Sequence, residues 1–341
     1  MSKIFRWMAG VLLAIAPCTA VAAQSASEIA ALKAKAERGD ANAQYKLGEI
    51  YAYGTGVPQD SAQAAMWYRK AADQGYSDAQ FNLGVSYQTG QGVPQDYAQA
   101  VVWYSKAADQ GDPEAQTNLG VLYAGGQGVP QDYVQAAAWW RKAAEQGSIL
   151  AQLKLGLSYA EGRGVPQIYP LAAMWYRKAA DQGNVAAEDL LGVLYENGQG
   201  VPQDYEEAAR WYRKAASEGI ADALWIADAQ DRLGRLYDLG KGVRQDYTQA
   251  SVWYRKAAEH GNSDAQWGLG LLYLGGRGVP QEYSEAYFWL DLAAAGKLDA
   301  ARAEAVPKAR ALAASMLAPA DLSAAQERAR KWFEDHPAEP Q

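Results

Sequence analysis

Apolar and small residues recur along this chain at helical spacing, in short stretches separated by glycine-containing turns. In one kind of stretch, Ala43, Leu47 and Tyr51 follow one another at intervals of four, so a helix would place them in one stripe. A second kind of stretch comes next, with apolar positions spaced by three and four residues: Ala64, Trp67, Tyr68 and Ala71. Each pair of stretches is therefore predicted to form two amphipathic helices joined by a turn.

This pair of stretches occurs seven times. Its framing alanine returns at steps of 36 residues, with one step of 42: Ala43, Ala79, Ala115, Ala151, Ala187, Ala229 and Ala265. A turn resembling Gly-x-Gly-Val-Pro-Gln-Asp-Tyr follows each copy. A helix pair of this size cannot bury both apolar faces alone, but stacked copies can. The sequence therefore predicts an all-α solenoid in which each repeat packs on its neighbours.

The recurring polar and glycine positions have structural interpretations. Gly48 would cost about 1 kcal/mol in an isolated helix, so its recurrence predicts that a second helix packs too close there for a Cβ atom. Gly54 is expected to end the first helix in a left-handed conformation, and Asp60 to cap the second helix. Arg69 and Lys70, with their equivalents, are expected to form a solvated outer stripe.

Some copies depart from the pattern. Ile168 stands where other copies have the capping Asp, and Glu282 stands there in the last copy. The last copy also has Phe288-Trp289-Leu290, which we align with the Trp-Tyr-Arg of the others. Six added residues within 221–228 are expected to lengthen the first helix of the sixth repeat by more than one turn. They are interpreted as a local packing adjustment or as a protrusion that binds a partner.

The chain is predicted to divide into five segments. These are a signal peptide (1–23), an N-terminal capping helix (24–39), seven repeats (40–296), C-terminal capping helices (297–336) and a frayed tail (337–341). The repeats are expected to start near residues 40, 76, 112, 148, 184, 220 and 262. In the C-terminal capping helices, Pro307 should kink or delimit the first helix, and Asp321 should cap the second.

The first residues are typical of an export signal. Lys3 and Arg6 precede a short apolar run, and small-residue cleavage sites end near Ala22. The run is shorter than the ~20 residues of a membrane span, so no stable membrane insertion is expected after cleavage. Cys18, the only cysteine, would be removed, which leaves no disulfide or thiolate ligand. The mature protein is predicted to be periplasmic or secreted; an ordinary N-terminal helix and a lipoprotein acylated at Cys18 are the alternatives.

Composition and charge narrow the class of partner. The formal net charge is −7, which argues against nucleic acid, because a duplex binder needs a basic face. A basic protein partner remains compatible with this charge. The chain has 22 Tyr and 12 Trp but only 4 Phe, a balance that suits a thin core with a large surface.

The repeated residues identify a family resemblance. The pattern Ala-x-x-x-Leu-Gly-x-x-Tyr-x-x-Gly-x-Gly-Val-x-x-Asp-x-x-x-Ala-x-x-Trp-Tyr-x-Lys-Ala-Ala-x-x-Gly resembles the Sel1-like repeat, a relative of the tetratricopeptide repeat, from about residue 40 to residue 296. The resemblance implies a right-handed α/α superhelix with a concave groove, and a scaffold or adaptor function, commonly in exported bacterial proteins. A cysteine-rich branch of the family has been described as binding or hydrolysing penicillins. This chain lacks those cysteines, so that activity is not expected here.

The resemblance implies that the first helix of each pair lines the groove, so variable positions beside the Ala-x-x-x-Leu-Gly frame are predicted to contact a partner protein. These residues are Tyr45, Phe81, Val85, Val121, Leu153, Leu157, Asp189, Glu196, Asp231, Arg235, Asp238 and Trp267. Apolar anchors of the partner would bind from Phe81 to Leu157, and a basic segment would bind the acidic end around Asp189 and Asp231. The alternative for the aliphatic residues is that they only pack between helices.

Catalytic and metal-binding patterns are missing from the sequence. The two histidines, His260 and His336, are far apart, and no His-x-x-x-His pair, cysteine ligand set or Gly-x-Ser-x-Gly motif occurs. No cofactor, metal or enzymatic activity is therefore expected. A cell-wall glycan-binding protein, using Tyr and Trp rings, and a glycan hydrolase with paired carboxylates are the alternatives. The sequence makes no prediction of the oligomeric state.

Overall fold

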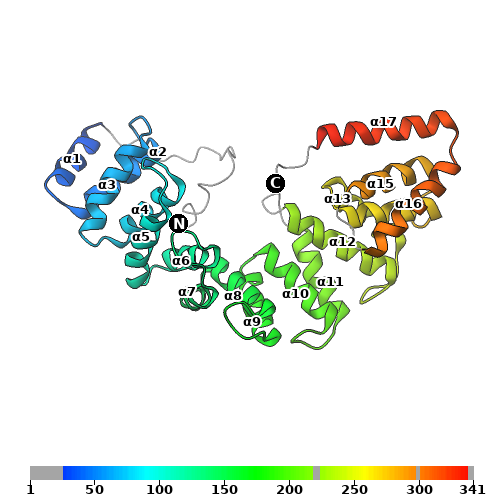
Figure 1. The fold of residues 1–341 in the computed structure, drawn as a ribbon, viewed down its shortest axis with the longest axis horizontal. Coiled ribbons are helices and arrows are strands. Elements are labelled where there is room, and N and C mark those ends of the chain that lie inside the picture. Colours follow the sequence, from blue (N-terminus) through cyan, green and yellow to red (C-terminus); the bar gives the residue numbers. More distant parts are fainter. Residues whose placement is uncertain (1–25, 218–222, 297–299, 337–341) are drawn as a thin grey trace. The chain divides into compact units, whose positions relative to one another are not determined.

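The computed structural model describes residues 26–217, 223–296 and 300–336. The predicted signal peptide and tail, and the first part of the insertion, lie outside these ranges. Within them the chain forms seventeen helices and no strand, so the prediction of an all-α solenoid is confirmed (Figure 1). The chain divides into two compact units, one ending at Gln131 and the other beginning at Asp132.

The first unit contains the N-terminal cap, two complete repeats and the first helix of the third repeat. Its helices are α1 (Ala26–Glu37), α2 (Ala41–Tyr53), α3 (Ser61–Asp73), α4 (Ser77–Thr89), α5 (Tyr97–Asp109) and α6 (Pro113–Gly125). Each helix packs on the next along the chain. Leu47, Tyr68 and Leu83 are buried between them, as the predicted stripes require.

The second unit contains the remaining repeats and the C-terminal cap. Its helices are α7 (Tyr133–Glu145), α8 (Ile149–Glu161), α9 (Tyr169–Ala180), α10 (Val185–Asn197), α11 (Tyr205–Ala216), α12 (Ala223–Leu239), α13 (Tyr247–Glu259), α14 (Ser263–Gly275), α15 (Tyr283–Ala295), α16 (Ala300–Ser315) and α17 (Pro319–Asp335). From α7 to α16 consecutive helices pack together, and α17 packs on α15. First helices of successive repeats also contact each other, α10 with α12 and α12 with α14. The first helices of repeats 5 to 7 therefore form a continuous layer.

The glycine inside each first helix marks a close approach between helices, as predicted. A Cβ atom on Gly48 would lie 2.5 Å from ring carbons of Tyr68, and one on Gly156 would lie 2.6 Å from those of Tyr176. In the last repeat the neighbour of Gly270 is Leu290. Leu290 therefore occupies the position of Tyr68, and the alignment of Phe288-Trp289-Leu290 with Trp-Tyr-Arg is wrong by one residue.

The loops also follow the predicted chemistry, with one contact that connects repeats. Gly54 has φ 68° and ends α2, and the Asp60 side chain accepts a hydrogen bond from the Gln63 backbone N–H at 3.0 Å. The second glycine of the loop packs against the start of the preceding repeat's second helix. At Gly164, which has φ +74°, a Cβ atom would overlap the carbonyl of Tyr133. This position therefore requires glycine for both conformation and packing.

Arginine and lysine of the second helix have different roles. Lys70 is exposed, as expected, and its Nζ lies 4.2 Å from the centre of the Trp67 ring. Arg69 instead donates a hydrogen bond to the hydroxyl of Tyr87 in the next repeat, and Arg141 donates to Tyr159 at 2.7 Å. Arg141, Arg177 and Arg213 are exposed, as predicted, whereas Arg69 and Arg255 are half-buried. The arginines also connect neighbouring repeats, which the prediction did not include.

The insertion lengthens a first helix as predicted, and one predicted helix cap is wrong. Helix α12 has 17 residues where the first helices of the other repeats have 13, an excess of more than one turn. Ile226 is buried against Val185 and Ala216, which fits the packing interpretation of the insertion. Helix α16 runs through Pro307, so this proline does not delimit the helix. Helix α17 begins at Pro319, so Asp321 lies in its first turn and does not cap it.

No helix among the described residues is both long enough and apolar enough to cross a bilayer.

Replacing Ile168 with aspartate is expected to stabilise the protein. Ile168 occupies the N-cap position of α9 and provides no side-chain hydrogen bond, whereas Asp204 caps the equivalent helix α11 through the Glu207 N–H at 3.0 Å. The Leu171 N–H donates to the Ile168 carbonyl at 3.0 Å. A carboxylate at 168 would give this N–H a charged acceptor, so Ile168→Asp should raise the free energy of unfolding by about 0.5 to 1 kcal/mol. Urea unfolding measures this, with Asp204→Ala as the reverse change. Equal stability of Ile168→Asp and wild type would contradict the interpretation.

Candidate functional site

The structure distributes the predicted partner-binding residues over both units. The first unit contains Tyr45, Phe81, Val85 and Val121, and the second contains the other eight. Four of the twelve side chains are buried, namely Phe81, Leu153, Asp189 and Asp231. The other eight are half-buried, namely Tyr45, Val85, Val121, Leu157, Glu196, Arg235, Asp238 and Trp267.

The position two residues after the framing alanine lies at the interface between the two helices of a repeat. The Phe81 ring is 5.7 Å from the Tyr104 ring, and the Tyr45 ring is 6.0 Å from the Tyr68 ring. Tyr68 and Tyr104 also pack against the glycines of the first helices, Gly48 and Gly84. The expectation that Phe81 faces a ligand is therefore not met, because this position packs inside the repeat.

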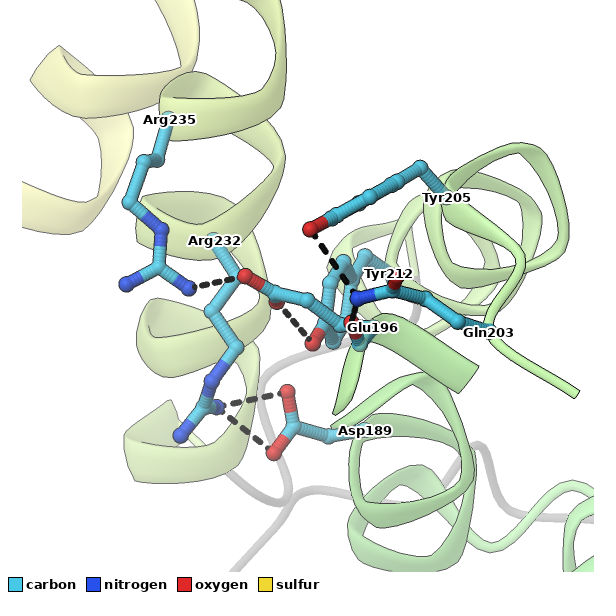
Figure 2. Close-up of polar contacts among 7 residues, drawn as sticks. All are labelled: Asp189, Glu196, Gln203, Tyr205, Tyr212, Arg232 and Arg235. Carbon is cyan, nitrogen blue, oxygen red and sulfur yellow. Dashed lines mark hydrogen bonds and ion pairs between the residues drawn. The ribbon is translucent and has the colours of Figure 1, made fainter. Parts of the chain in front are cut away.

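Asp189 occupies the same position in α10 and is also not available to a partner. Its side chain is 0% exposed, and both carboxylate oxygens lie 2.7 Å from Nη1 of Arg232 on α12 (Figure 2). A buried carboxylate needs such a partner, because an isolated charge in the protein interior is costly. The prediction that Asp189 binds a basic segment of a partner is thus not supported by its position.

Glu196 and Arg235 form a second ion pair between α10 and α12. Arg235 Nη2 lies 2.8 Å from Glu196 Oε1, and the Tyr212 hydroxyl donates to Glu196 Oε2 at 2.7 Å (Figure 2). In the second repeat the equivalent residue, Gln88, accepts a hydrogen bond from Tyr104 at 2.6 Å. An acid at this position therefore keeps the hydrogen bond with the tyrosine and also forms an ion pair with an arginine of the next repeat.

The same arrangement continues toward the C-terminal cap. Asp238 on α12 lies 3.8 Å from Nη1 of Arg277, which follows α14, and Asp264 on α14 lies 2.9 Å from Arg302 on α16. We call these ion pairs, together with Asp231, which interacts electrostatically with Arg235 and Asp264, the charged face. Its members are Asp189, Glu196, Asp231, Arg232, Arg235, Asp238, Asp264, Arg277 and Arg302. In repeats 2 to 4 the positions of Asp189 and Arg235 are apolar or uncharged, so the charged face is specific to the C-terminal repeats.

Burial changes the acidity of two carboxyl groups in the charged face. It raises the pKa of Asp189 to about 6, although the Arg232 guanidinium acts in the opposite direction. It raises the pKa of Asp231 to about 7, with Arg235 opposing the rise and Asp264 adding to it. Asp231 therefore carries only part of a negative charge at neutral pH.

Replacing Asp231 with asparagine is expected to stabilise the protein at alkaline pH. In the unfolded chain the carboxyl titrates near its ordinary pKa of 3.8, and in the folded chain near 7, so the folded state binds more protons between these values. The contribution of Asp231 to stability is full below pH 4 and is lost as the pH rises to 7. Asp231→Asn removes this dependence and should gain about 2 kcal/mol at pH 8.

Urea unfolding between pH 4 and pH 8 measures this effect. Asp181→Asn, at an exposed position after α9, is the matched control and should leave the pH dependence unchanged. Equal pH profiles for wild type and Asp231→Asn would contradict the prediction.

A buried charge in repeat 5 was not anticipated. The residue after the framing alanine is Gln in six repeats, and Gln44 donates to the Ala36 carbonyl at 2.9 Å. Repeat 5 has Glu188, which is fully buried and lies 2.8 Å from Lys214 Nζ. The same Nζ donates to the Ala180 carbonyl at 2.8 Å. Lys214 thus replaces the glutamine amide as donor and also neutralises the glutamate.

Potential metal ligands and histidines are dispersed over the described residues. No group of three potential metal ligands occurs among them. His260 follows α13, and His336 stacks on Trp332 at the end of α17 with ring centres 4.3 Å apart. The charged face contains ion pairs whose groups already interact with one another, which is suited to binding and to holding helices together.

Comparison with known proteins identifies the repeat. The family model of the Sel1 repeat matches residues 41–76, 77–112, 113–148, 149–184, 185–220, 227–262 and 263–297. A Sel1 repeat protein from Oxalobacter formigenes is 38% identical, with a TM-score of 0.64, over 83% of this chain and 80% of that one. A protective antigen of uropathogenic Escherichia coli with an SLR fold is 31% identical, with a TM-score of 0.50, over 90% of this chain and 94% of that one. No curated protein matches the chain.

Proposed function

Because the chain belongs to the Sel1 repeat family, whose members are generally protein-interaction scaffolds, we propose that it binds a partner polypeptide along its first helices. The main contact is the charged face of repeats 5 to 7. Apolar contact area comes from Leu157 and Trp267, two half-buried residues of the predicted set that lie in the same unit.

One observation carries this proposal: the repeats are nearly identical where they hold the solenoid together and differ on the first-helix layer. Glycines, caps and the buried aromatic residues recur in almost every copy. The charged residues of α10 and α12 occupy positions that the frame leaves free. Arg235 is half-buried there, in a layer where α10, α12 and α14 contact each other. A surface with fixed, half-exposed charged groups is suited to selecting a partner.

We also propose that the protein works in the periplasm or outside the cell. Lys3 and Arg6, followed by a short apolar run and small residues, support export. The protective antigen among the similar structures also supports a location outside the cytoplasm.

The glycan-binding alternative receives less support. Sugar binding would use exposed tryptophan rings, but Trp67 and Trp103 are buried in the repeats. Lys70 and Lys106 cover these rings, with Nζ 4.2 and 3.9 Å from the ring centres.

Site-specific crosslinking in the native cell tests the proposed function. A photoreactive benzoylphenylalanine is placed at Trp267, on the first helix α14, or at Val252, on the exposed side of the second helix α13. The proposal predicts a covalent product with a discrete protein from position 267 and none from position 252. A product from 252 alone, or a product with glycan strands, would argue against it.

A further inference from the structure

We propose that the segment bound at the charged face is acidic and that Arg232, Arg235 and Arg277 contact its carboxylates. This inference rests on the proposed function and specifies the chemistry of the partner. It reverses the sequence-based expectation of a basic segment, because the acids of the charged face are used inside the chain.

The arginines of the charged face are in most pairs more exposed than their acids. In three successive ion pairs the arginine side chain is more exposed than its acid: 26% for Arg232 against 0% for Asp189, 36% for Arg235 against 16% for Glu196, and 43% for Arg277 against 21% for Asp238. A partner that approaches the first-helix layer thus meets guanidinium groups before carboxylates. Only the last pair, Asp264 with Arg302, has the more exposed acid.

The ion pairs of the charged face use only some of the hydrogen-bond donors of each arginine. A guanidinium has five N–H donors. Arg232 uses Nη1 for both oxygens of Asp189, and Arg235 uses Nη2 for Glu196. In Figure 2 the other terminal nitrogen of each arginine lies on the side away from these acids. These donors can form the paired hydrogen bonds that guanidinium groups make with carboxylates.

The arginines of the charged face are held in place before a partner binds. Glu196 is held by the Tyr212 hydroxyl as well as by Arg235, and a hydrogen bond from Tyr254 similarly reaches Asp238. The arginines are therefore positioned by acids that the second helices fix in place. Binding to such groups costs less side-chain entropy than binding to free arginines.

The charged face has five acids and four arginines, but its acids oppose an acidic partner less than this count indicates. Burial raises the pKa of Asp231, which lies near Arg235 and Arg232, to about 7. Its carboxyl is partly uncharged at neutral pH and opposes an acidic ligand less than an ordinary aspartate would. Phosphate groups also bind arginine, but the net charge of −7 disfavours a long nucleic acid, which would contact the acidic surface beyond these arginines.

Binding of short labelled peptides to the full chain tests the inference. A glutamate-rich peptide and a lysine-rich peptide of equal length are compared by fluorescence anisotropy at low salt, together with a single-stranded oligonucleotide. Arg235→Gln combined with Arg277→Gln removes two positive charges and keeps a polar side chain at each position. Arg210→Gln combined with Arg330→Gln, at exposed positions on α11 and α17, removes the same charge elsewhere.

The glutamate-rich peptide is expected to bind the wild type, to bind the Arg235/Arg277 variant about tenfold or more weakly, and to bind the control variant as it binds the wild type. Binding should weaken as salt is added. The inference would be overturned by tighter binding of the lysine-rich peptide, or by an equal loss of peptide binding in both variants. Binding of the oligonucleotide instead of the peptide, with dependence on Arg235, would also overturn it.

Binding of the protein captured by crosslinking from position 267 is then measured with the same variants. This measurement distinguishes failure of this inference from failure of the proposed function. If its binding is lost in the Arg235/Arg277 variant but the glutamate-rich peptide does not compete with it, the charged face is the binding site and the acidic partner is wrong. If its binding is unchanged in that variant, the charged face itself is not the site.

Discussion

Replacing Arg232 with alanine will lower the free energy of unfolding by about 3 to 5 kcal/mol at neutral pH, the usual cost of leaving a buried charge without its partner. Asp189 is 0% exposed, and both of its oxygens lie 2.7 Å from Arg232 Nη1. The loss should be smaller below pH 4, where the carboxyl is protonated in both the unfolded and the folded chain. Urea unfolding at both pH values measures the effect.

Two variants control for this result. Arg210→Ala removes an exposed arginine that pairs with Glu207 and should change stability by less than about 1 kcal/mol. Asp189→Asn added to Arg232→Ala removes the buried charge and should recover a large part of the loss. If Arg232→Ala is as mild as Arg210→Ala, then Arg232 does not hold α10 and α12 together.

Replacing Gly164 with alanine is expected to cost about 3 kcal/mol or more, from a left-handed backbone and an overlap with a neighbouring repeat. Gly164 has φ +74°, and a Cβ atom there would meet the Tyr133 carbonyl at the start of α7. Backbone atoms cannot move aside as a flexible side chain can, so the loop and α7 must separate. In a solenoid such a change weakens the contact between adjacent repeats and can divide one unfolding transition into two.

Gly183 provides a matched control. It has φ +82°, but nothing lies within 4 Å of its added Cβ atom. Gly183→Ala should therefore show only the conformational cost of about 1 to 2 kcal/mol. The difference between the two variants in denaturant unfolding measures the contact between repeats. Equal losses would mean that the loop glycine is needed only for its backbone conformation.

The repeated positions of the solenoid could be predicted because the same residue types recur at the same spacing in seven copies. A single glycine in a helix has many explanations, but one that recurs beside each framing leucine indicates a close contact. The contact of Gly48 with Tyr68 confirms this. The greater length of α12 was also predictable, because six residues added directly before a framing alanine are expected to extend the helix that contains this alanine.

The charged face could be predicted only in part. The sequence identified Asp189, Glu196 and Arg235 as variable, but it did not reveal that these acids are occupied within the chain. Asp189 pairs with Arg232, 43 residues later, and Glu196 with Arg235, 39 residues later. Both spacings lie close to the 42-residue step between these repeats. Comparing each acid with bases one repeat later would have found both pairs.

The exposure of each group could not be obtained from spacing. Position 231 is equivalent to position 81, and both side chains are buried, although one is acidic and the other aromatic. The tyrosine of the second helix packs close to this position and buries its side chain. Because this tyrosine recurs in the repeats, the side chain is buried whether it is acidic or aromatic. Arg232 and Arg235, in contrast, are half-buried, with 26% and 36% of their side chains exposed.

Hydrogen exchange of the full chain, measured with and without the protein captured by crosslinking, tests the central claim most directly. If the partner binds along the first helices of repeats 5 to 7, exchange will slow in α10, α12 and α14, with smaller changes in α11, α13 and α15. Slower exchange confined to α11, α13 and α15 would contradict the claim and place the partner on the second helices.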